Sequence, residues 1–273
     1  MPETNPESEI YRKQTVEGKA LVKVLWTGGF DSTYRMVELS RHDVIVQPYY
    51  LSDKIRRSKN LELRAMSEIS EDIENDPGTR CRILPLIINK ASEFKPDRKI
   101  VEAWKRLRNS SNIGTQYVWL AQFAKSNPGM EICIERGSSC SGTSYCIRQN
   151  GKLREINDSG LIYRVLDQDN SNTDILALFG SMHFPIIHLS KMEMLENYRN
   201  MGFSKVMEKT WFCHTPVNGE TCGVCNPCKQ AIEKGLGFKV SAAGLKRNEL
   251  ELKYQRFLWF KIWKKFRYRI YGY

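Results

Sequence analysis

The chain has 273 residues, which suffices for one large domain with an appended segment, the arrangement we expect here. Lysine and arginine outnumber aspartate and glutamate by 42 to 31, and the net charge of +11 predicts an anionic partner. Residues 1–18 are polar without a signal segment and no apolar run reaches about eighteen residues, so composition argues against a secreted or membrane-spanning chain and for a cytoplasmic one. We expect residues 1–18 to be a flexible leader.

Strand-like and helix-like patterns alternate along the next two thirds of the chain. Apolar runs predict strands at residues 20–26, 43–50, 81–88, 130–135 and 184–188, and helical periodicity predicts helices at residues 31–41, 58–74, 100–107, 113–125 and 191–201. This alternation predicts an α/β fold with a doubly wound, mostly parallel sheet. Such sheets bind ligands at the carboxyl ends of their strands.

A glycine-rich loop follows the first predicted strand. It reads Thr27-Gly28-Gly29-Phe30-Asp31-Ser32-Thr33 and leads directly into a predicted helix. Two glycines allow close approach of the backbone to a ligand, and the N-terminus of a helix favours an anion. The loop therefore predicts a nucleotide-phosphate site, with a plain strand-to-helix connection as the alternative. It is neither a G-x-x-x-x-G-K-[ST] loop nor a G-x-G-x-x-G loop.

Residues 136–174 are polar, with one short apolar run at residues 161–166. We expect either a lid or substrate loop there, or an ordinary surface insertion. Cys140 and Cys146 lie in this stretch, where they are either inert thiols or carriers of sulfur chemistry.

Four cysteines lie within sixteen residues in the pattern C-x8-C-x2-C-x2-C, at Cys213, Cys222, Cys225 and Cys228. Four thiolates close a tetrahedral Zn²⁺ shell, and Gly219 and Gly223 allow the turns that aim several ligands at one point. A shell filled by sulfur leaves no position for water, so we expect a structural zinc that pins the C-terminal segment to the sheet. Two disulfides or an iron–sulfur cluster are the alternatives.

The loop and the cysteines together, in this order, resemble the 7-cyano-7-deazaguanine synthases of queuosine biosynthesis, which are PP-loop ATP pyrophosphatases. The segment from Pro185 to Lys191, the pair Arg108-Asn109 and the approach from Glu208 to Cys213 are similar to the family's motifs, so that the resemblance covers roughly residues 20–238. It implies an adenine nucleotide alpha hydrolase-like fold with an ATP-binding domain over residues 19–204 and a zinc segment over residues 205–240. The family's glycine-rich substrate segment with Tyr-Pro-Asp-Cys-Arg and its Tyr-Gly-Gln-Arg-His element are not found.

The resemblance implies ATP and Mg²⁺ at the loop and cleavage between the α- and β-phosphates. Thr27, Ser32 and the amides of Gly28 and Gly29 are then implied to hold the β- and γ-phosphates. Asp31 would organise magnesium, and Lys191 would neutralise the leaving pyrophosphate. The implied catalytic set is Asp31, Ser32 and Lys191, and the implied cofactor-binding set is Thr27, Gly28, Gly29, Phe30, Asp31, Ser32, Thr33, Arg108 and Asn109. The implied activity is that of a ligase that adenylates a small-molecule carboxylate and aminates it with ammonia to an amide or a nitrile.

Two other functions are open. One is a PP-loop sulfurtransferase acting on a nucleotide or tRNA, which requires Cys140 or Cys146 in the ATP crevice with a lowered thiol pKa. The other is a non-catalytic, zinc-stabilised module that binds nucleic acid.

The end of the chain is basic and aromatic. Residues 246–273 hold nine basic residues, two acids and nine aromatic residues, and we expect a helix over residues 241–273. Such a helix can lie on an anionic membrane surface or stack on nucleic acid. The alternative is that it packs on its own domain or on the second subunit of a homodimer.

Overall fold

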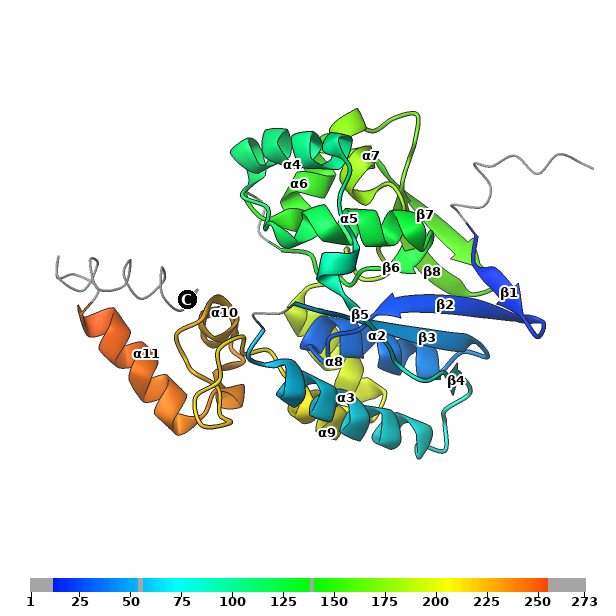
Figure 1. Ribbon diagram of the computed structural model, residues 1–273. Coiled ribbons are helices and arrows are strands. Elements are labelled where there is room, and N and C mark those ends of the chain that lie inside the picture. The colour runs from blue at the N-terminus through cyan, green and yellow to red at the C-terminus, as the bar shows by residue number, and fades with distance from the viewer. Residues whose placement is uncertain (1–11, 54–55, 138–139, 255–273) are drawn as a thin grey trace, which may run out of the picture.

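The computed structural model describes residues 12–53, 56–137 and 140–254, which build a mostly parallel sheet with helices on both faces (Figure 1). The strands of the sheet are β1 (Gln14–Val16), β2 (Lys19–Leu25), β3 (Ile45–Ser52), β4 (Arg82–Ile83), β5 (Ile87–Lys90), β6 (Met130–Glu131) and β9 (Met182–His183). Their order is β4-β3-β2-β6-β9, with β5 paired to β3 and β1 to β2. All pairs are parallel except β1–β2. The predicted α/β class is confirmed, and the order reverses between β2 and β6, where such sheets bind ligands.

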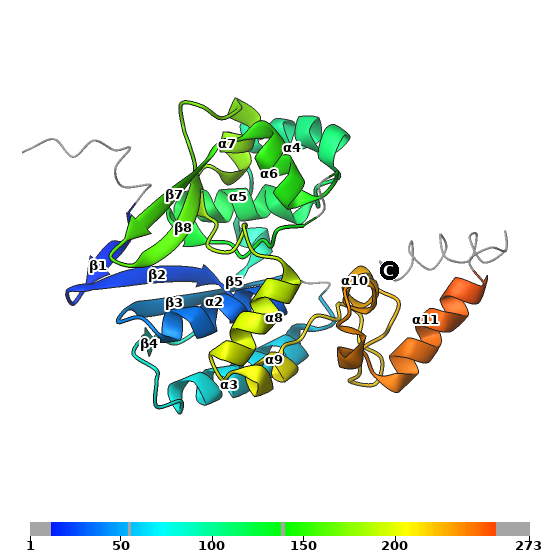
Figure 2. The ribbon, with the colours of Figure 1, turned by 180° about the vertical axis from the view of Figure 1, so that it is seen from behind.

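The helices form two layers (Figures 1 and 2). One face carries α2 (Phe30–Ser40), α3 (Lys59–Glu74), α8 (Lys191–Asn200) and α9 (Ser204–Lys209). The other carries α4 (Arg98–Ser111), α5 (Gln116–Ser126), α6 (Thr143–Asn150) and α7 (Thr173–Phe179), with the short η1 (Ala91–Glu93) leading in. Neighbouring side chains of a strand point to opposite faces, so Tyr50 and Leu51 of β3 belong to two separate cores.

Residues 136–174 hold regular elements that the sequence did not predict. Apart from residues 138 and 139, they form α6, the antiparallel hairpin β7 (Leu153–Asp158) and β8 (Leu161–Leu166), and the start of α7. The hairpin was not predicted because β7 is largely exposed and polar, while β8 buries Leu161, Tyr163 and Val165 in the core. A single apolar face is enough to hold a hairpin against a domain.

Two predicted strands and the predicted leader need correction. The strand at residues 81–88 is two short strands, β4 and β5, separated at Pro85, which cannot donate to a ladder. The strand at residues 184–188 instead ends at His183, and the Leu189 amide turns back to the Ile186 carbonyl at 2.9 Å. The prediction of a flexible leader is wrong at Gln14–Val16, which pairs with β2, and residues 1–11 fall outside the described residues.

The C-terminal part follows α9 and holds α10 (Asn226–Glu233), η2 (Gly237–Lys239) and α11 (Ala242–Tyr254). It lies at the end of the molecule toward which β2 points (Figure 1). The predicted C-terminal helix is present from Ala242 to Tyr254, and the rest of that prediction, residues 255–273, falls outside the described residues. Among the helices described, none has both the length and the apolarity to cross a membrane.

Candidate functional site

A cavity of about 310 Å³ opens where β2 and β6 end, at the reversal of the strand order. The glycine-rich loop forms one side of it, through Thr27, Gly29, Phe30, Asp31 and Ser32. This volume lies at the lower end of the range for small-molecule pockets. The loop is therefore placed where the sequence predicts it, at a ligand-binding edge of the sheet.

The loop is held close to α3 and to the start of α2. Gly28 has a φ of +65°, and a Cβ there would lie 3.0 Å from the Glu62 carbonyl oxygen, so a side chain is excluded. The Thr33 amide donates to the Gly29 carbonyl at 3.0 Å and begins the α2 ladder. The Thr27 amide donates to Ser32 Oγ at 3.3 Å, and the two hydroxyls lie 3.5 Å apart. Hydroxyls and a helix N-terminus thus meet at the cavity, an arrangement that favours an anion.

Charged side chains from distant segments meet beside the loop. Lys191 begins α8 after a capping box made by Ser190 and Glu193, and its ammonium donates to the Asp31 carboxylate. Glu135 lies 3.8 Å from Lys191 Nζ and also pairs with Lys234. The fold thereby brings together Asp31 and Lys191, which the resemblance implied as catalytic.

Two further cations line the cavity. Arg56 Nε donates to Glu62 Oε1 at 2.8 Å, and Glu62 also accepts from the Tyr50 hydroxyl at 2.6 Å. Lys239 Nζ donates to the carbonyls of Met207 at 2.6 Å and Thr210 at 3.0 Å. Burial, and then the charge of Lys191, lower the pKa of Lys239 to about 7. Among the lining residues there are four cations and three carboxylates, which suits a ligand that brings negative charge.

Some residues of the implied set lie elsewhere. Arg108 and Asn109 are exposed on α4 and are not among the residues that line the cavity; the Arg108 guanidinium lies 4.9 Å from the Trp104 ring centre. Thr33 is buried, and its Oγ1 accepts from Trp26 Nε1 at 3.0 Å. Gly28 shapes the loop from behind, and its carbonyl accepts a hydrogen bond from the Trp211 amide at 2.8 Å.

The two cysteines considered for sulfur chemistry are not among the lining residues either. Cys140 is exposed, and burial raises the pKa of the Cys146 thiol. A different cysteine, Cys133, does line the cavity, and desolvation raises the pKa of its thiol well above its ordinary value. A protonated thiol is a poor nucleophile.

Several residues of the cavity wall were not anticipated from sequence, among them Glu135, Lys234, Lys239 and Trp211. Glu135 closes the predicted strand at residues 130–135, so the rule that ligands bind at the carboxyl ends of strands could have found it. The other three enter the wall because the C-terminal segment folds back over the loop. No local pattern indicates that return.

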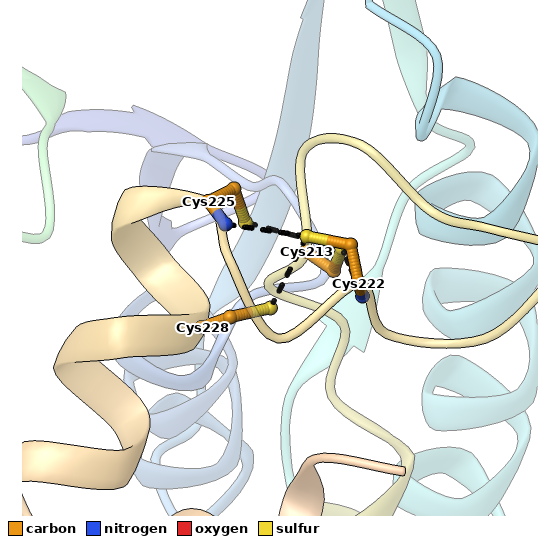
Figure 3. Close-up of side chains that lie close together, drawn as sticks. All are labelled: Cys213, Cys222, Cys225 and Cys228. Atoms are coloured by element: carbon orange, nitrogen blue, oxygen red, sulfur yellow. Dashed lines mark hydrogen bonds between the residues drawn. The ribbon is translucent and has the colours of Figure 1, made fainter. Parts of the chain in front are cut away.

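The four cysteines meet at one point, as Figure 3 shows. All are buried, and their four Sγ atoms lie within 4.8 Å of one another. The Sγ atoms of Cys222 and Cys228 are 3.9 Å apart, as are those of Cys213 and Cys225. Tetrahedral Zn²⁺ with bonds near 2.3 Å needs sulfur atoms about 3.8 Å apart, so the donor set fits this metal.

Backbone amides and α11 support the cluster. The amides of Cys222 and Cys225 each donate to a cluster sulfur at 3.2 Å. Gly223, with a φ of +79°, lets the chain pass so close to α11 that a Cβ would lie 1.8 Å from the Gly244 carbonyl oxygen. Arg247 on α11 donates to the Cys222 carbonyl at 3.0 Å. The cluster, α10 and α11 therefore form one packed unit.

Comparison with known proteins does not identify a function for this chain. No protein-family model matches the chain, and no curated protein matches it. Fourteen chains of solved structures match, one of them an NMN synthetase from Francisella tularensis. That match has 14% sequence identity and a TM-score of 0.36 and covers 88% of this chain and 85% of the other. So loose an overlap does not carry an activity from one protein to the other.

Proposed function

We propose that this protein is an ATP-dependent enzyme that cleaves ATP between its α- and β-phosphates. The observation that carries the proposal is the pairing of Lys191 with Asp31 beside the Thr27–Ser32 hydroxyls at the N-terminus of α2. The loop would hold the β- and γ-phosphates, and Lys191 would neutralise the leaving pyrophosphate. Asp31 and Glu135 supply carboxylate oxygens, the ligands that Mg²⁺ prefers, and would hold the magnesium that accompanies ATP.

The proposed reaction has two steps. An oxygen of a substrate carboxylate attacks the α-phosphorus, the bond to the β-phosphate oxygen breaks, and pyrophosphate leaves with the bonding electron pair. Ammonia then attacks the acyl carbon of the adenylate, AMP departs, and a proton is released as the amide forms. The mixed charge of the cavity supports both an anionic substrate and a charged leaving group. Conversion of the amide to a nitrile would need a second ATP.

The four-cysteine cluster would hold one structural Zn²⁺ in this enzyme. Its fit rests on four buried sulfurs at tetrahedral spacing. The sulfurtransferase alternative needs a thiol in the cavity with a lowered pKa, and desolvation moves the pKa of Cys133 in the opposite direction. A binding module without turnover would form no AMP and pyrophosphate from ATP, so product analysis distinguishes that alternative from the proposed enzyme.

The test is to incubate the protein with Mg–ATP, ammonia and a panel of carboxylates that includes deazaguanine carboxylate. We expect AMP and pyrophosphate, and a substrate that loses about one mass unit when the carboxylate becomes an amide. Asp31→Asn and Lys191→Ala should each lower kcat by at least about a hundredfold, or about 3 kcal/mol in the barrier. The matched control is Lys125→Ala, which breaks an exposed ion pair with Asp97 outside the cavity. ADP and phosphate as products, or full activity in Asp31→Asn, would refute the proposal.

A further inference from the structure

The segment that enters the four-cysteine cluster is also a wall of the ATP cavity. Trp211, Phe212 and His214 line the cavity, and Cys213, between them, is the first sulfur of the cluster. The chain that leaves the cluster returns to the same cavity. It contributes Pro227, Gln230, Ala231, Lys234, Leu236 and Lys239. The segment that enters the cluster and the segment that leaves it therefore both belong to the wall of the cavity.

Trp211 joins the two sites directly. Its amide donates to the Gly28 carbonyl at 2.8 Å, in the phosphate loop. Its indole Nε1 donates to the Cys213 carbonyl at 2.8 Å, in the residue that supplies the first sulfur. The Trp211 carbonyl oxygen would be 3.6 Å from a Cβ placed on Gly29, so Trp211 also lies in van der Waals reach of the second glycine of the loop.

The wall is also held from the far side of the cluster. Lys239, eleven residues after Cys228, donates to the carbonyls of Met207 and Thr210, and Thr210 directly precedes Trp211. Coordination of Cys213 and Cys228 to one ion would thus fix both ends of the unit that supports the loop. Besides the contacts of α11, weak contacts to sulfur link Cys222 with Cys213 and with Cys228, and coordination to one ion would add a stronger link.

We propose that Trp211 is a positioning residue that couples the four-cysteine site to the phosphate loop, so that zinc and nucleotide each strengthen the binding of the other. The proposal rests on the ATP site proposed above. Coupling of binding free energies is reciprocal, and typical values change an affinity by about 5- to 150-fold. Retention of zinc must then depend on the nucleotide, which a merely structural metal site remote from the cavity would not show.

The experiment measures zinc and nucleotide binding without turnover. Zinc content of the purified protein is determined first and should be close to one ion per chain. The rate of zinc loss to a chromophoric chelator is then measured with and without Mg²⁺ and α,β-methylene ATP, whose α–β linkage cannot be hydrolysed. We expect the analogue to slow zinc loss by at least about fivefold. Zinc removal should also weaken analogue binding, and by linkage that factor equals the factor by which the analogue raises the equilibrium affinity for zinc.

Trp211→Phe keeps an aromatic ring but removes the donor to the Cys213 carbonyl. We expect this variant to retain one zinc ion while the effect of the analogue on zinc loss falls below about twofold. Trp104→Phe is the matched control, because it removes an indole bond of the same kind, at 3.1 Å to the Gly114 carbonyl, on α4 outside the cavity. It should keep the full coupling.

The outcomes separate the two proposals. If the wild-type protein binds the analogue but loses zinc at an unchanged rate, the coupling is refuted and the ATP site stands. If the zinc-loaded protein does not bind the analogue, both are refuted. Equal coupling in Trp211→Phe and wild type would show that the Trp211 indole bond does not carry the coupling, and would refute that part of the proposal. If Trp211→Phe loses its zinc during purification, the two wild-type measurements still decide whether the coupling exists.

Discussion

The lysines of the cavity differ in what neutralises them. Lys191 and Lys234 pair with carboxylates, whereas Lys239 donates to the carbonyls of Met207 and Thr210 and to the Thr210 hydroxyl. Carbonyls near the end of α9 favour the ammonium form, but burial and the charge of Lys191 oppose it and lower the pKa of Lys239 to about 7. Glu208 is the acid whose charge acts in the other direction. Lys239 is thus partly discharged near neutral pH.

Lys239 should leave a signature in the pH dependence of stability. A lysine whose pKa is lower in the folded than in the unfolded state penalises folding below the folded pKa, and the penalty disappears as pH rises toward 10.5. Wild type should therefore gain stability relative to Lys239→Met between about pH 7 and 9.5, with a slope of at most about 1.4 kcal/mol per pH unit. Urea unfolding at three pH values measures this. Lys125→Met, at an exposed lysine outside the cavity, is the reference variant. If the difference in unfolding free energy between wild type and Lys239→Met does not change with pH, the carbonyls keep Lys239 protonated and its pKa is not lowered.

Sequence reasoning reached the residues of the cavity unevenly. Thr27, Asp31 and Ser32 could be predicted because a loop between a strand and a helix has its own local pattern. Lys191 needed the resemblance, since a lysine at the start of a helix is ordinarily solvated. Lys239 could not be predicted, because it reaches the wall only through the fold of the cluster, which begins at Cys213, 180 residues after Thr33. The prediction that Arg108 binds the cofactor stays untested; Arg108 is exposed on α4 and is not among the residues that line the cavity.

At the scale of elements, a buried ionic network ties three segments of the fold together. Glu131 of β6 accepts from Arg35 Nε of α2 at 2.8 Å, and Lys13, just before β1, lies 2.8 Å from the same carboxylate. Burial works against ionisation, but the charges of Arg35 and Lys13 prevail and lower the pKa of Glu131 to about 2. The network explains why the chain before β1 is held against the sheet.

Glu131→Gln should destabilise the protein by about 3 kcal/mol, because two buried cations lose their shared carboxylate. Chemical denaturation at pH 7 measures the effect. In the wild type, the stabilisation is complete above about pH 4.5 and is lost as pH falls toward 2, so the two proteins should converge in acid. Glu68→Gln, at the exposed Arg64–Glu68 pair, should cost less than about 0.5 kcal/mol. A loss below 1 kcal/mol in Glu131→Gln would show that the network is not important for stability.

Elements with strong periodicity were predicted well, and those defined by distant pairing were not. The helix beginning at Lys59 follows the amphipathic pattern, with Ala65, Met66 and Ile69 on its buried side, whereas the helix beginning at Phe30 is buried almost all round. The β7–β8 hairpin was missed because only β8 buries its side chains, and its anchor is the pair of backbone bonds between Arg164 and Phe184. Such pairing leaves no trace in local composition.

At the scale of the whole molecule, charge is concentrated at the end that carries the cluster. Residues 255–273 contain six basic residues, eight aromatic residues and no acid, so removing them lowers the net charge from +11 to +5. The part of α11 that precedes them is fixed to the cluster by Arg247 and Asn248. A truncation after Tyr254 therefore keeps the contacts that hold the cluster, whereas one at residue 246 would remove them.

We propose that residues 255–273 bind an anionic membrane surface, and deletion of this segment tests it. Each basic residue near such a surface contributes about 1 kcal/mol, so the truncated protein should bind phosphatidylserine-containing vesicles at least about tenfold more weakly. Its affinity for Mg²⁺ and α,β-methylene ATP should be unchanged, because all lining residues of the cavity precede residue 240. Trp259→Ala with Trp263→Ala separates interfacial insertion of the rings from attraction by charge alone, and vesicles of phosphatidylcholine are the uncharged control.

Unchanged vesicle binding after truncation would contradict the proposal. Salt-sensitive binding to nucleic acid that disappears with the segment would favour that partner instead, and a truncated protein that aggregates would indicate that the segment packs on the domain or on a second copy.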